Sequence, residues 1–187
     1  RMVVTIMQPA YLPWLGFFDR MDASDVCIVL DHVAMDRASK TRFANRNRIR
    51  TRQGWAWLTV PVAVHGSPPL CAIPLAGDGS WRGRHLASLD YAYPRTRWYR
   101  EHRPFFQDFY ARPMTRLTEA ALPPQDYLAR ALGIDTPVVR SSTLGVAGTK
   151  TQMLVNLCLE VGADTYISGP FGRDYLDREA FAANGIG

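Results

Sequence analysis

The 187-residue chain is predicted to form an α/β fold, with a mostly parallel Rossmann-like sheet, flanking helices and a helical insertion. Short β-branched apolar runs near both ends of the chain are typical of strands buried inside a parallel sheet. Segments with the helical spacing of apolar residues follow these runs, and this alternation indicates βαβ units. The length is that of about one domain, and neither a repeat nor a linker divides the chain. We therefore expect a single domain over residues 1–187, with a helical layer at about 81–133.

The N-terminal segments predict the first βαβ unit. Val3–Met7 is a short β-branched run, Trp14–Met21 suits a short helix, and Val26–Leu30 is a second buried strand. Ligand sites of parallel sheets lie at the carboxyl ends of the strands. The polar and aromatic residues that follow these two strands are therefore expected to lie near one another: Gln8, Tyr11, Asp31 and His32.

The rest of the chain continues the alternation. Trp55–Val60 and Cys71–Leu75 are predicted to pair as a hairpin. In the helical layer, Pro123 and Pro124 are expected to interrupt a helix. The remaining predicted elements are helical segments from Trp81 onward, over Pro104–Arg112, Met114–Leu122 and Gln125–Leu132, a strand over Thr136–Arg140, a helix over Lys150–Val161, a strand over Thr165–Ile167 and a helix over Arg178–Ala183.

The composition is that of a folded protein and excludes several classes. A chain with 47% hydrophobic and 21% charged residues is neither disordered nor of low complexity. Its three cysteines form no CxxC pair and its four histidines lack metal-ligand spacing, so neither a disulfide framework nor a metal site is expected. Apolar runs are much shorter than the roughly 20 residues of a membrane span, and a signal pattern is absent. We expect a cytoplasmic protein without membrane contact.

Basic charge is concentrated in the first part of the chain. Residues 1–112 hold 16 basic and 9 acidic side chains, whereas residues 113–187 hold 6 and 8. Guanidinium groups bind phosphate through paired hydrogen bonds, so nucleotides and RNA are candidate partners of the basic segment 37–52. Within it, the interleaved Asn45 and Asn47 favour a shaped anion pocket around Arg46 and Arg48. The alternative is a solvated loop.

Two glycine-containing segments are further candidates. The segment 145-GVAGTKT-151 lacks the spacing of a phosphate-binding loop, so Lys150 is either an anion ligand near a helix start or an ordinary surface lysine. The segment 168-SGPFGRDYLD-177 follows the last predicted strand, where a glycine turn lets backbone N–H groups approach a ligand. There Arg173 is a candidate anion ligand, Asp174 a candidate ligand for a hydroxyl or amine, and Asp177 the expected helix cap.

Few residues are candidates for acid–base catalysis. The GxGxxG and GxSxG patterns are absent, so no cofactor is predicted. His32 beside Asp31, and His85 on an apolar helix face, are the groups suited to proton transfer near neutral pH. A structural role for His85 is the alternative. The cysteines lie in predicted core elements or lack a visible activator, which favours direct transfer over a covalent intermediate.

Five segments span most of the chain in order: 7-MQPAYLPWLGFFDRM-21, 25-DVCIVLDHV-33, 45-NRNRIRTRQGWAWLTVPV-62, 81-WRGRHLASLDYAY-93 and 164-DTYISGPFGRDYLD-177. Together they resemble the WbqC-like protein family. The resemblance implies a bacterial protein encoded among genes for surface-polysaccharide or specialised-metabolite assembly. It marks as family motif positions Gln8, Pro9, Tyr11, Trp14, Asp31, Asn45, Arg46, Asn47, His85, Lys150, Ser168, Gly169, Arg173 and Tyr175.

The chain departs from that family in two respects. His32 stands where the family commonly has a second acid, so a role that needs paired carboxylates loses support. Family members also tend to continue beyond the position of Gly187, so a closing segment is expected to be missing from this sequence.

The resulting hypothesis is a transferase of surface-glycan or natural-product biosynthesis. It would bind a phosphate-bearing activated substrate (a nucleotide, a sugar nucleotide or a thioester) and transfer an acyl or similar group to an amine or hydroxyl. His85 or His32 would be the general base, and Gln8, Asn45 and Asn47 would orient the substrate. Two alternatives stay open: an RNA-binding or aminoacyl-tRNA-dependent enzyme whose aromatic residues stack on bases, and a noncatalytic pathway scaffold. The oligomeric state is not predicted.

Overall fold

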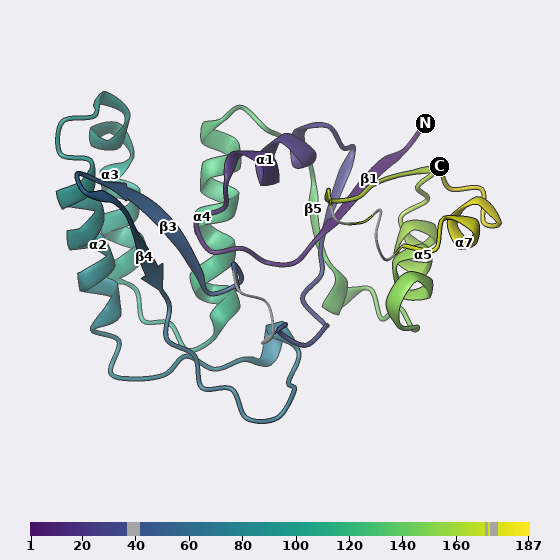
Figure 1. Cartoon of the computed structure of the whole chain (residues 1–187), viewed down its shortest axis with the longest axis horizontal. Coiled ribbons are helices and arrows are strands. Elements are labelled where there is room, and N and C mark those ends of the chain that lie inside the picture. The colour runs from purple at the N-terminus through teal and green to yellow at the C-terminus, as the bar shows by residue number, and fades with distance from the viewer. Residues whose placement is uncertain (37–41, 171, 173–175) are drawn as a thin grey trace. The chain divides into compact units, whose positions relative to one another are not determined.

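The computed structural model describes residues 1–36, 42–170, 172 and 176–187, and most of its helices and strands are labelled in Figure 1. The chain divides into two compact units, each described by itself. The first unit consists of Arg1–Gln8, Trp14–His32 and Ala129–Gly187, and the second of Pro9–Pro13 and Val33–Leu128. The assignment of the chain to a single domain stays a prediction. Within the described residues, no helix is both long and apolar enough to cross a membrane.

A four-stranded parallel sheet forms the centre of the first unit, which confirms the predicted α/β class. Its strands are β1 (Val3–Met7), β2 (Val26–Val29), β5 (Val138–Arg140) and β6 (Thr165–Ile167). The strand order is β5-β2-β1-β6, and β1 pairs in parallel with both β2 and β6. The order of the strands reverses between β1 and β6, so the topological switch point of the sheet lies there.

Three helices of the first unit match the predicted segments: α1 (Leu15–Asp22), α5 (Lys150–Glu160) and α7 (Arg178–Ala182). α1 buries Phe17, Phe18 and Met21, the i, i+1, i+4 spacing of one helix face. α5 buries the apolar face that its sequence predicts. Asp177 caps α7, since its carboxylate accepts hydrogen bonds from the backbone N–H groups of Glu179 and Ala180.

The Asp177→Ala variant should unfold at a lower urea concentration than the wild-type chain. The substitution leaves the first N–H groups of α7 without their side-chain acceptor, which costs about 1 kcal/mol. Urea denaturation followed by circular dichroism measures this difference. Asp177→Asn, which keeps a capping oxygen, is the matched control and should lie within about 0.5 kcal/mol of the wild type; equal losses in both variants would contradict the capping role.

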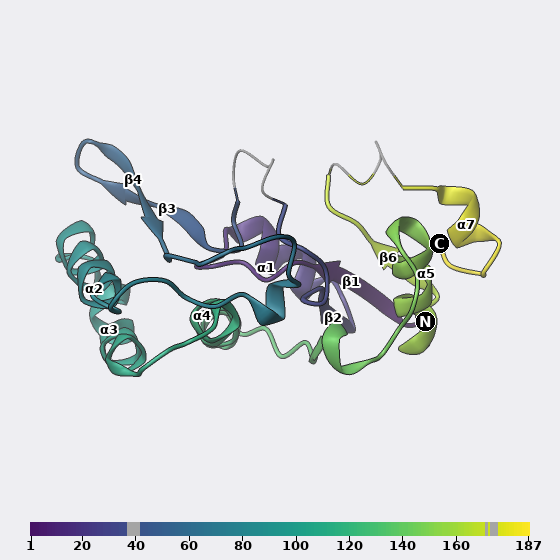
Figure 2. The same cartoon turned by 90° about the horizontal axis from the view of Figure 1, so that it is seen from below.

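The second unit combines a hairpin with helices. The hairpin strands are β3 (Arg46–Thr51) and β4 (Gly54–Thr59), and the helices are η1 (Leu70–Ala72), α2 (Trp81–Ala92), α3 (Arg97–Ala111) and α4 (Leu117–Ala131), whose last residues belong to the first unit. α2 packs beside α3 and beside β3, as Figures 1 and 2 show. The core of the unit contains fully buried Tyr11, Leu70, Phe109 and Leu117. The predicted helical layer is confirmed.

The predicted pairing of Trp55–Val60 with Cys71–Leu75 is wrong. β4 pairs instead with the arginine-containing strand β3, and Cys71 lies in the short helix η1. The physical reason is a period of two within the basic segment, where Ile49 is buried and Arg48 and Arg50 are exposed. This alternation forms a half-buried strand, whereas the charge of the basic segment alone favours a loop or a pocket.

The predicted interruption at Pro123 and Pro124 is also wrong, because α4 continues through both residues. Each proline removes one backbone hydrogen bond from the helix. The preceding turns bury Leu117, Ala120 and Ala121 with no exposed surface. Tertiary packing of this face therefore outweighs the local preference of the prolines.

Candidate functional site

The carboxyl ends of the parallel strands bring several predicted site residues to one edge of the sheet. Gln8 follows β1 and is exposed, Asp31 and His32 follow β2, and Ser168 and Gly169 follow β6. Neighbouring strands lie about 4.8 Å apart, so this edge spans roughly 14 Å from β5 to β6. Three of the four residues expected to lie together are thus on one edge, whereas Tyr11 belongs to the second unit.

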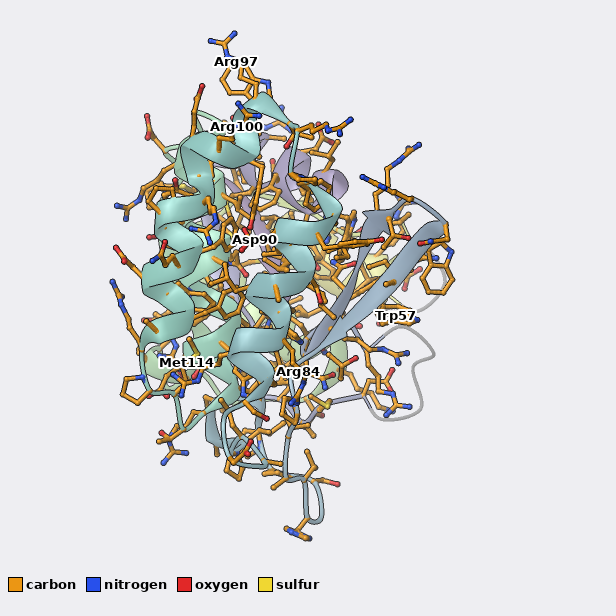
Figure 3. All side chains as sticks on the ribbon, turned by 90° about the vertical axis from the view of Figure 1, so that its left-hand side faces the viewer. Trp57, Arg84, Asp90, Arg97, Arg100 and Met114 are labelled. Carbon is orange, nitrogen blue, oxygen red and sulfur yellow. The ribbon has the colours of Figure 1, made fainter. Side chains whose placement is uncertain are left out.

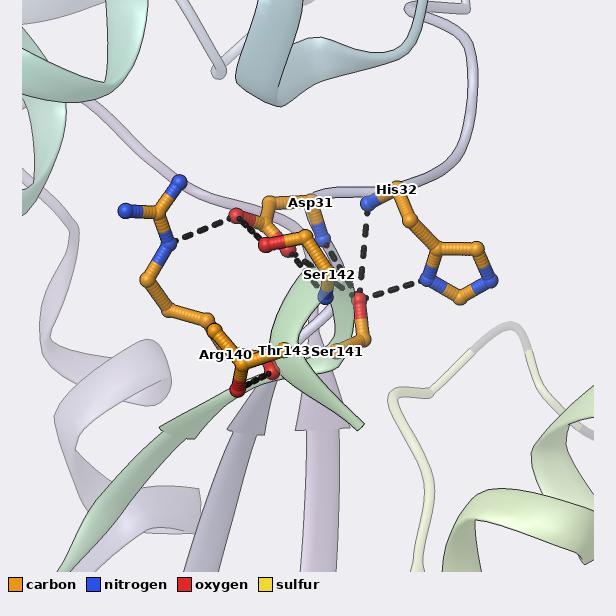
Figure 4. A network of polar contacts seen from close by, with 6 residues as sticks. All are labelled: Asp31, His32, Arg140, Ser141, Ser142 and Thr143. Carbon is orange, nitrogen blue, oxygen red and sulfur yellow. Dashed lines mark hydrogen bonds and ion pairs between the residues drawn. The ribbon is translucent and has the colours of Figure 1, made fainter. Parts of the chain in front are cut away.

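The carboxylate of Asp31 connects the ends of β2 and β5 (Figure 4) and has no exposed surface. Its Oδ1 accepts a hydrogen bond from the backbone N–H of Ser142 at 2.8 Å, and its Oδ2 accepts from Ser142 Oγ at 2.9 Å and from Arg140 Nε at 2.7 Å. Burial alone would raise the pKa of Asp31, but these hydrogen bonds outweigh burial and hold the pKa below its ordinary value. Asp31 is therefore a buried carboxylate at neutral pH.

Ser141 links this carboxylate to His32. Its Oγ lies 3.2 Å from Asp31 Oδ1 and 2.6 Å from His32 Nδ1, and it accepts a hydrogen bond from the backbone N–H of Asp31 at 3.0 Å. An ionised carboxylate only accepts hydrogen bonds, so Ser141 donates to Asp31 and accepts from Nδ1–H of His32. The lone pair of the neutral ring is then at Nε2, which points away from the network in Figure 4. We call Asp31, His32, Arg140, Ser141 and Ser142 the Asp31 network.

Arg140 adds a positive group to this edge. Its Nε is bound to Asp31, and 41% of its side chain is exposed. The outer end of the guanidinium therefore reaches solvent beside the ends of β2 and β5. Sequence reasoning missed Arg140, Ser141 and Ser142, because more than a hundred residues separate them from Asp31. The available signal was the predicted strand Thr136–Arg140, which Ser141 and Ser142 follow at the same sheet edge.

A second arginine lies at the switch point of the sheet. Arg20 of α1 packs against Gly169, where an added Cβ would lie 3.1 Å from its Nη1. A side chain at position 169 would displace this guanidinium, so the glycine permits the close approach. Sequence reasoning identified Gly169 but missed Arg20.

The other predicted residues of the first unit lie at helix starts or outside the described residues. Trp14 precedes α1, is 43% exposed and packs edge-on against Phe17. Lys150 is the exposed first residue of α5 and has a positive φ of 51°. Three predicted residues fall outside the described residues: Arg173, Asp174 and Tyr175.

His85 lies in the core of the second unit. Its Nδ1 is 2.8 Å from the hydroxyl of Tyr11, which also hydrogen-bonds to the hydroxyl of Tyr110. The ring of Trp81 packs edge-on against the imidazole at a centroid distance of 5.1 Å. Burial lowers the pKa of His85 to about 4, although a hydrogen bond to the backbone of Thr59 opposes this shift. His85 is therefore a neutral, hydrogen-bonded core residue at neutral pH.

The predicted asparagines of the second unit bind backbone groups. The side-chain amide of Asn45 donates to the carbonyl of Val60 at 2.9 Å, and that of Asn47 donates to the carbonyl of Leu12 at 2.7 Å. Both side chains are buried at the base of the hairpin. They hold the strands that present the two predicted arginines, Arg46 and Arg48.

The Asp31 network is the part of the described chain best suited to proton transfer. Ser141 fixes the ring of His32, so its Nε2 could accept a proton, and the Asp31 carboxylate would lie close to the charge that results. Among the described residues, no cluster of three or more His, Cys, Asp or Glu side chains is placed to hold a metal ion.

The parallel sheet defines an α/β protein, and the candidate site at its carboxyl edge lies where ligands bind in open α/β sheets. Residues 8–187 match the WbqC-like protein family, and the chain belongs to this family. The chain is 33% identical over 180 residues to the uncharacterized protein Rv1507c of Mycobacterium tuberculosis, a match that covers 95% of this chain and 77% of the relative. No solved structure matches the chain.

Proposed function

We propose that the protein is a transferase of surface-glycan or natural-product biosynthesis. It binds a phosphate-bearing activated donor and transfers an acyl or similar group from it to an amine or hydroxyl. The observation that supports a catalytic role is the hydrogen-bonded series from Asp31 through Ser141 to His32 at the carboxyl edge of the sheet. The pathway setting rests on the family.

His32 is the general base of the proposed reaction. As the amine or hydroxyl attacks the acyl carbon, His32 Nε2 accepts its proton, and the bond to the phosphate-bearing leaving group breaks with its electron pair. The proton at Nδ1 stays on the ring and is held by Ser141, so the positive charge forms close to the ionised Asp31. The exposed end of Arg140 can bind the negative charge of the donor or of the leaving group.

Direct transfer agrees with the state of the two buried cysteines. Burial raises the pKa of Cys27 and of Cys158 to about 12, so both thiols stay protonated at neutral pH. A protonated buried thiol is a poor nucleophile. Ser141 is 2% exposed and its oxygen already accepts hydrogen bonds, so we assign it to the positioning of His32.

The test is product formation in the native host. A strain without the gene, complemented with the wild-type chain, should restore a glycan or small-molecule product that differs from its precursor by the mass of the transferred group. Complementation with His32→Ala should lower product formation by roughly 10²–10⁴-fold, the usual contribution of a general base. Mass spectrometry of cell extracts measures product and precursor together.

The matched control is His65→Ala, which removes an exposed histidine in a loop of the second unit. This variant should restore the product fully at equal protein abundance. Full product formation by His32→Ala would overturn the catalytic assignment. If Arg140→Gln also restored the product fully, whereas the strain without the gene had none, the noncatalytic scaffold would be supported instead.

A further inference from the structure

The outer face of the β3–β4 hairpin carries only basic, aromatic and hydroxyl side chains. In the antiparallel register, Arg48 lies opposite Trp57, Arg50 lies opposite Trp55, and Arg46 lies opposite Thr59. Residues directly opposite each other project from the same side of a hairpin. We call Arg46, Arg48, Arg50, Trp55 and Trp57 the arginine–tryptophan face.

The other side of the hairpin belongs to the core of the unit. Asn47, Ile49 and Leu58 alternate with the residues of the arginine–tryptophan face and are buried. Towards α2, the hairpin leaves an open groove of about 330 Å³, lined in part by Ile49 and Tyr91. The hairpin is therefore fixed on one side, where β3 lies next to α2 (Figure 2), and Trp57 lies on its other side, away from α2, in Figure 3.

Arginines and tryptophans stack on one another across this face. The Arg46 guanidinium carbon lies 4.2 Å from the centre of the Trp57 ring, and that of Arg48 lies 5.1 Å from Trp55 and 5.5 Å from Trp57. Stacking orients the planar guanidinium group of Arg48, whose N–H edge can donate to phosphate. Trp55 is 57% exposed, so one large apolar ring remains open to a further planar partner.

We propose that the arginine–tryptophan face binds a single-stranded nucleic acid. Arg48 and Arg50 attract neighbouring phosphates, and the exposed indole ring of Trp55 provides a stacking surface for a base. Bases are available for such stacking only when they are unpaired, so a single strand fits this face and a duplex does not. This binding activity goes beyond the proposed transfer reaction and does not depend on it.

Binding is tested with a fluorescein-labelled, unstructured RNA of about 12 nucleotides, within the site sizes known for single-strand binders. Fluorescence anisotropy gives the association constant between about 50 and 200 mM salt. Two neutralised phosphates, one at Arg48 and one at Arg50, should give a slope of log K against log salt of about −1.4, since each contributes about −0.7 for a single strand. Arg48→Gln should make this slope shallower by about 0.7.

Trp55→Ala isolates the stacking contribution. Loss of one base-stacking ring should weaken RNA binding by roughly 5- to 150-fold with little change in the salt slope. The side chain is mostly exposed, and circular dichroism verifies that the variant keeps its secondary structure.

An arginine–tryptophan pair on α3 serves as the control. It tests whether RNA binding belongs to the arginine–tryptophan face or to any exposed arginine and tryptophan. Arg97 stacks on Trp98 at 4.7 Å, and Trp98 is 62% exposed; Figure 3 shows Arg97 at the end of its helix, away from Trp57. Trp98→Ala should leave RNA affinity within twofold of the wild type, on the order of measurement error.

Two outcomes would overturn the proposal. They are the absence of RNA binding at low salt, and an equal loss of affinity in Trp98→Ala and Trp55→Ala. Either outcome would show that the arginine–tryptophan face is not a binding surface. A DNA strand of the same sequence should bind with similar affinity, because phosphate contacts and base stacking do not involve the 2′-hydroxyl. A loss of pathway product by His32→Ala is independent of these results.

Discussion

Asp31→Asn is expected to lower the free energy of unfolding by about 3 kcal/mol. In the wild-type chain, each carboxylate oxygen of Asp31 faces two donors. The amide group of asparagine places an NH2 against one of these pairs. Serine hydroxyls can rotate away, but the backbone N–H of Ser142 cannot, and the partly exposed Arg140 can turn away only by giving up its hydrogen bond to residue 31. Either orientation of the amide therefore loses a charge-assisted hydrogen bond or leaves a buried group unpaired.

Urea denaturation followed by tryptophan fluorescence measures this loss. Arg140→Gln is the comparison, because it removes one of the four donors and leaves the carboxylate three partners. We expect its destabilisation to be smaller than that of Asp31→Asn. The reverse order, or a wild-type free energy of unfolding in Asp31→Asn, would show that the buried carboxylate does not hold the ends of β2 and β5 together.

The sheet was predictable because its strands carry a local signal. Val3–Met7 and Thr165–Ile167 were predicted with the bounds they have in the structure, since both are short β-branched runs between turns. The carboxyl-edge rule then located Asp31 and His32 correctly. These inferences need only the identity of each segment and the parallel order of the strands.

The rest of the Asp31 network depends on contacts that no local pattern contains. Serine is common in turns, so Ser141 and Ser142 after a strand carry little information by themselves. They become informative only when β5 is known to pair with β2, because this pairing brings them to Asp31. From the sequence, His32 and His85 are similar candidates for the general base. The structure distinguishes them by burial, because His85 lies in the core and His32 is half-buried.

The hairpin was mispredicted because net charge concealed its alternation. A run of arginines favours solvent-exposed chain, yet every second position of β3 points into the core. The same alternation places the arginines and tryptophans on one face. Arg46 and Arg48 therefore lie on a strand in place of a loop, with Arg46 half-buried and Arg48 exposed, and their binding of an anion stays a prediction.

Lowering the pH from about 6.5 to about 4 should destabilise the wild-type chain by about 3 kcal/mol through His85 alone. Its pKa is about 4 in the folded chain and about 6.5 in the unfolded chain, so the unfolded state binds more protons in this window. The stabilisation that the neutral His85 contributes is therefore fully present above the pKa of the unfolded chain, about 6.5, and is lost as the pH falls towards the pKa of the folded chain, about 4. Carboxylates with lowered pKa, such as Asp31 and Asp90, lose their contributions only below about pH 4.

His85→Gln provides the matched variant, because glutamine can accept from Tyr11 and donate to a backbone carbonyl but does not titrate. Its free energy of unfolding, measured by urea denaturation at several pH values, should depend much less on pH in this window than that of the wild type. His65→Gln, in an exposed loop, should keep the wild-type slope. An unchanged slope in His85→Gln would contradict the lowered pKa. A base with a pKa near 4 accepts protons weakly at neutral pH, so a flattened slope argues against His85 as the general base of the proposed reaction and leaves His32 as the other proposed base.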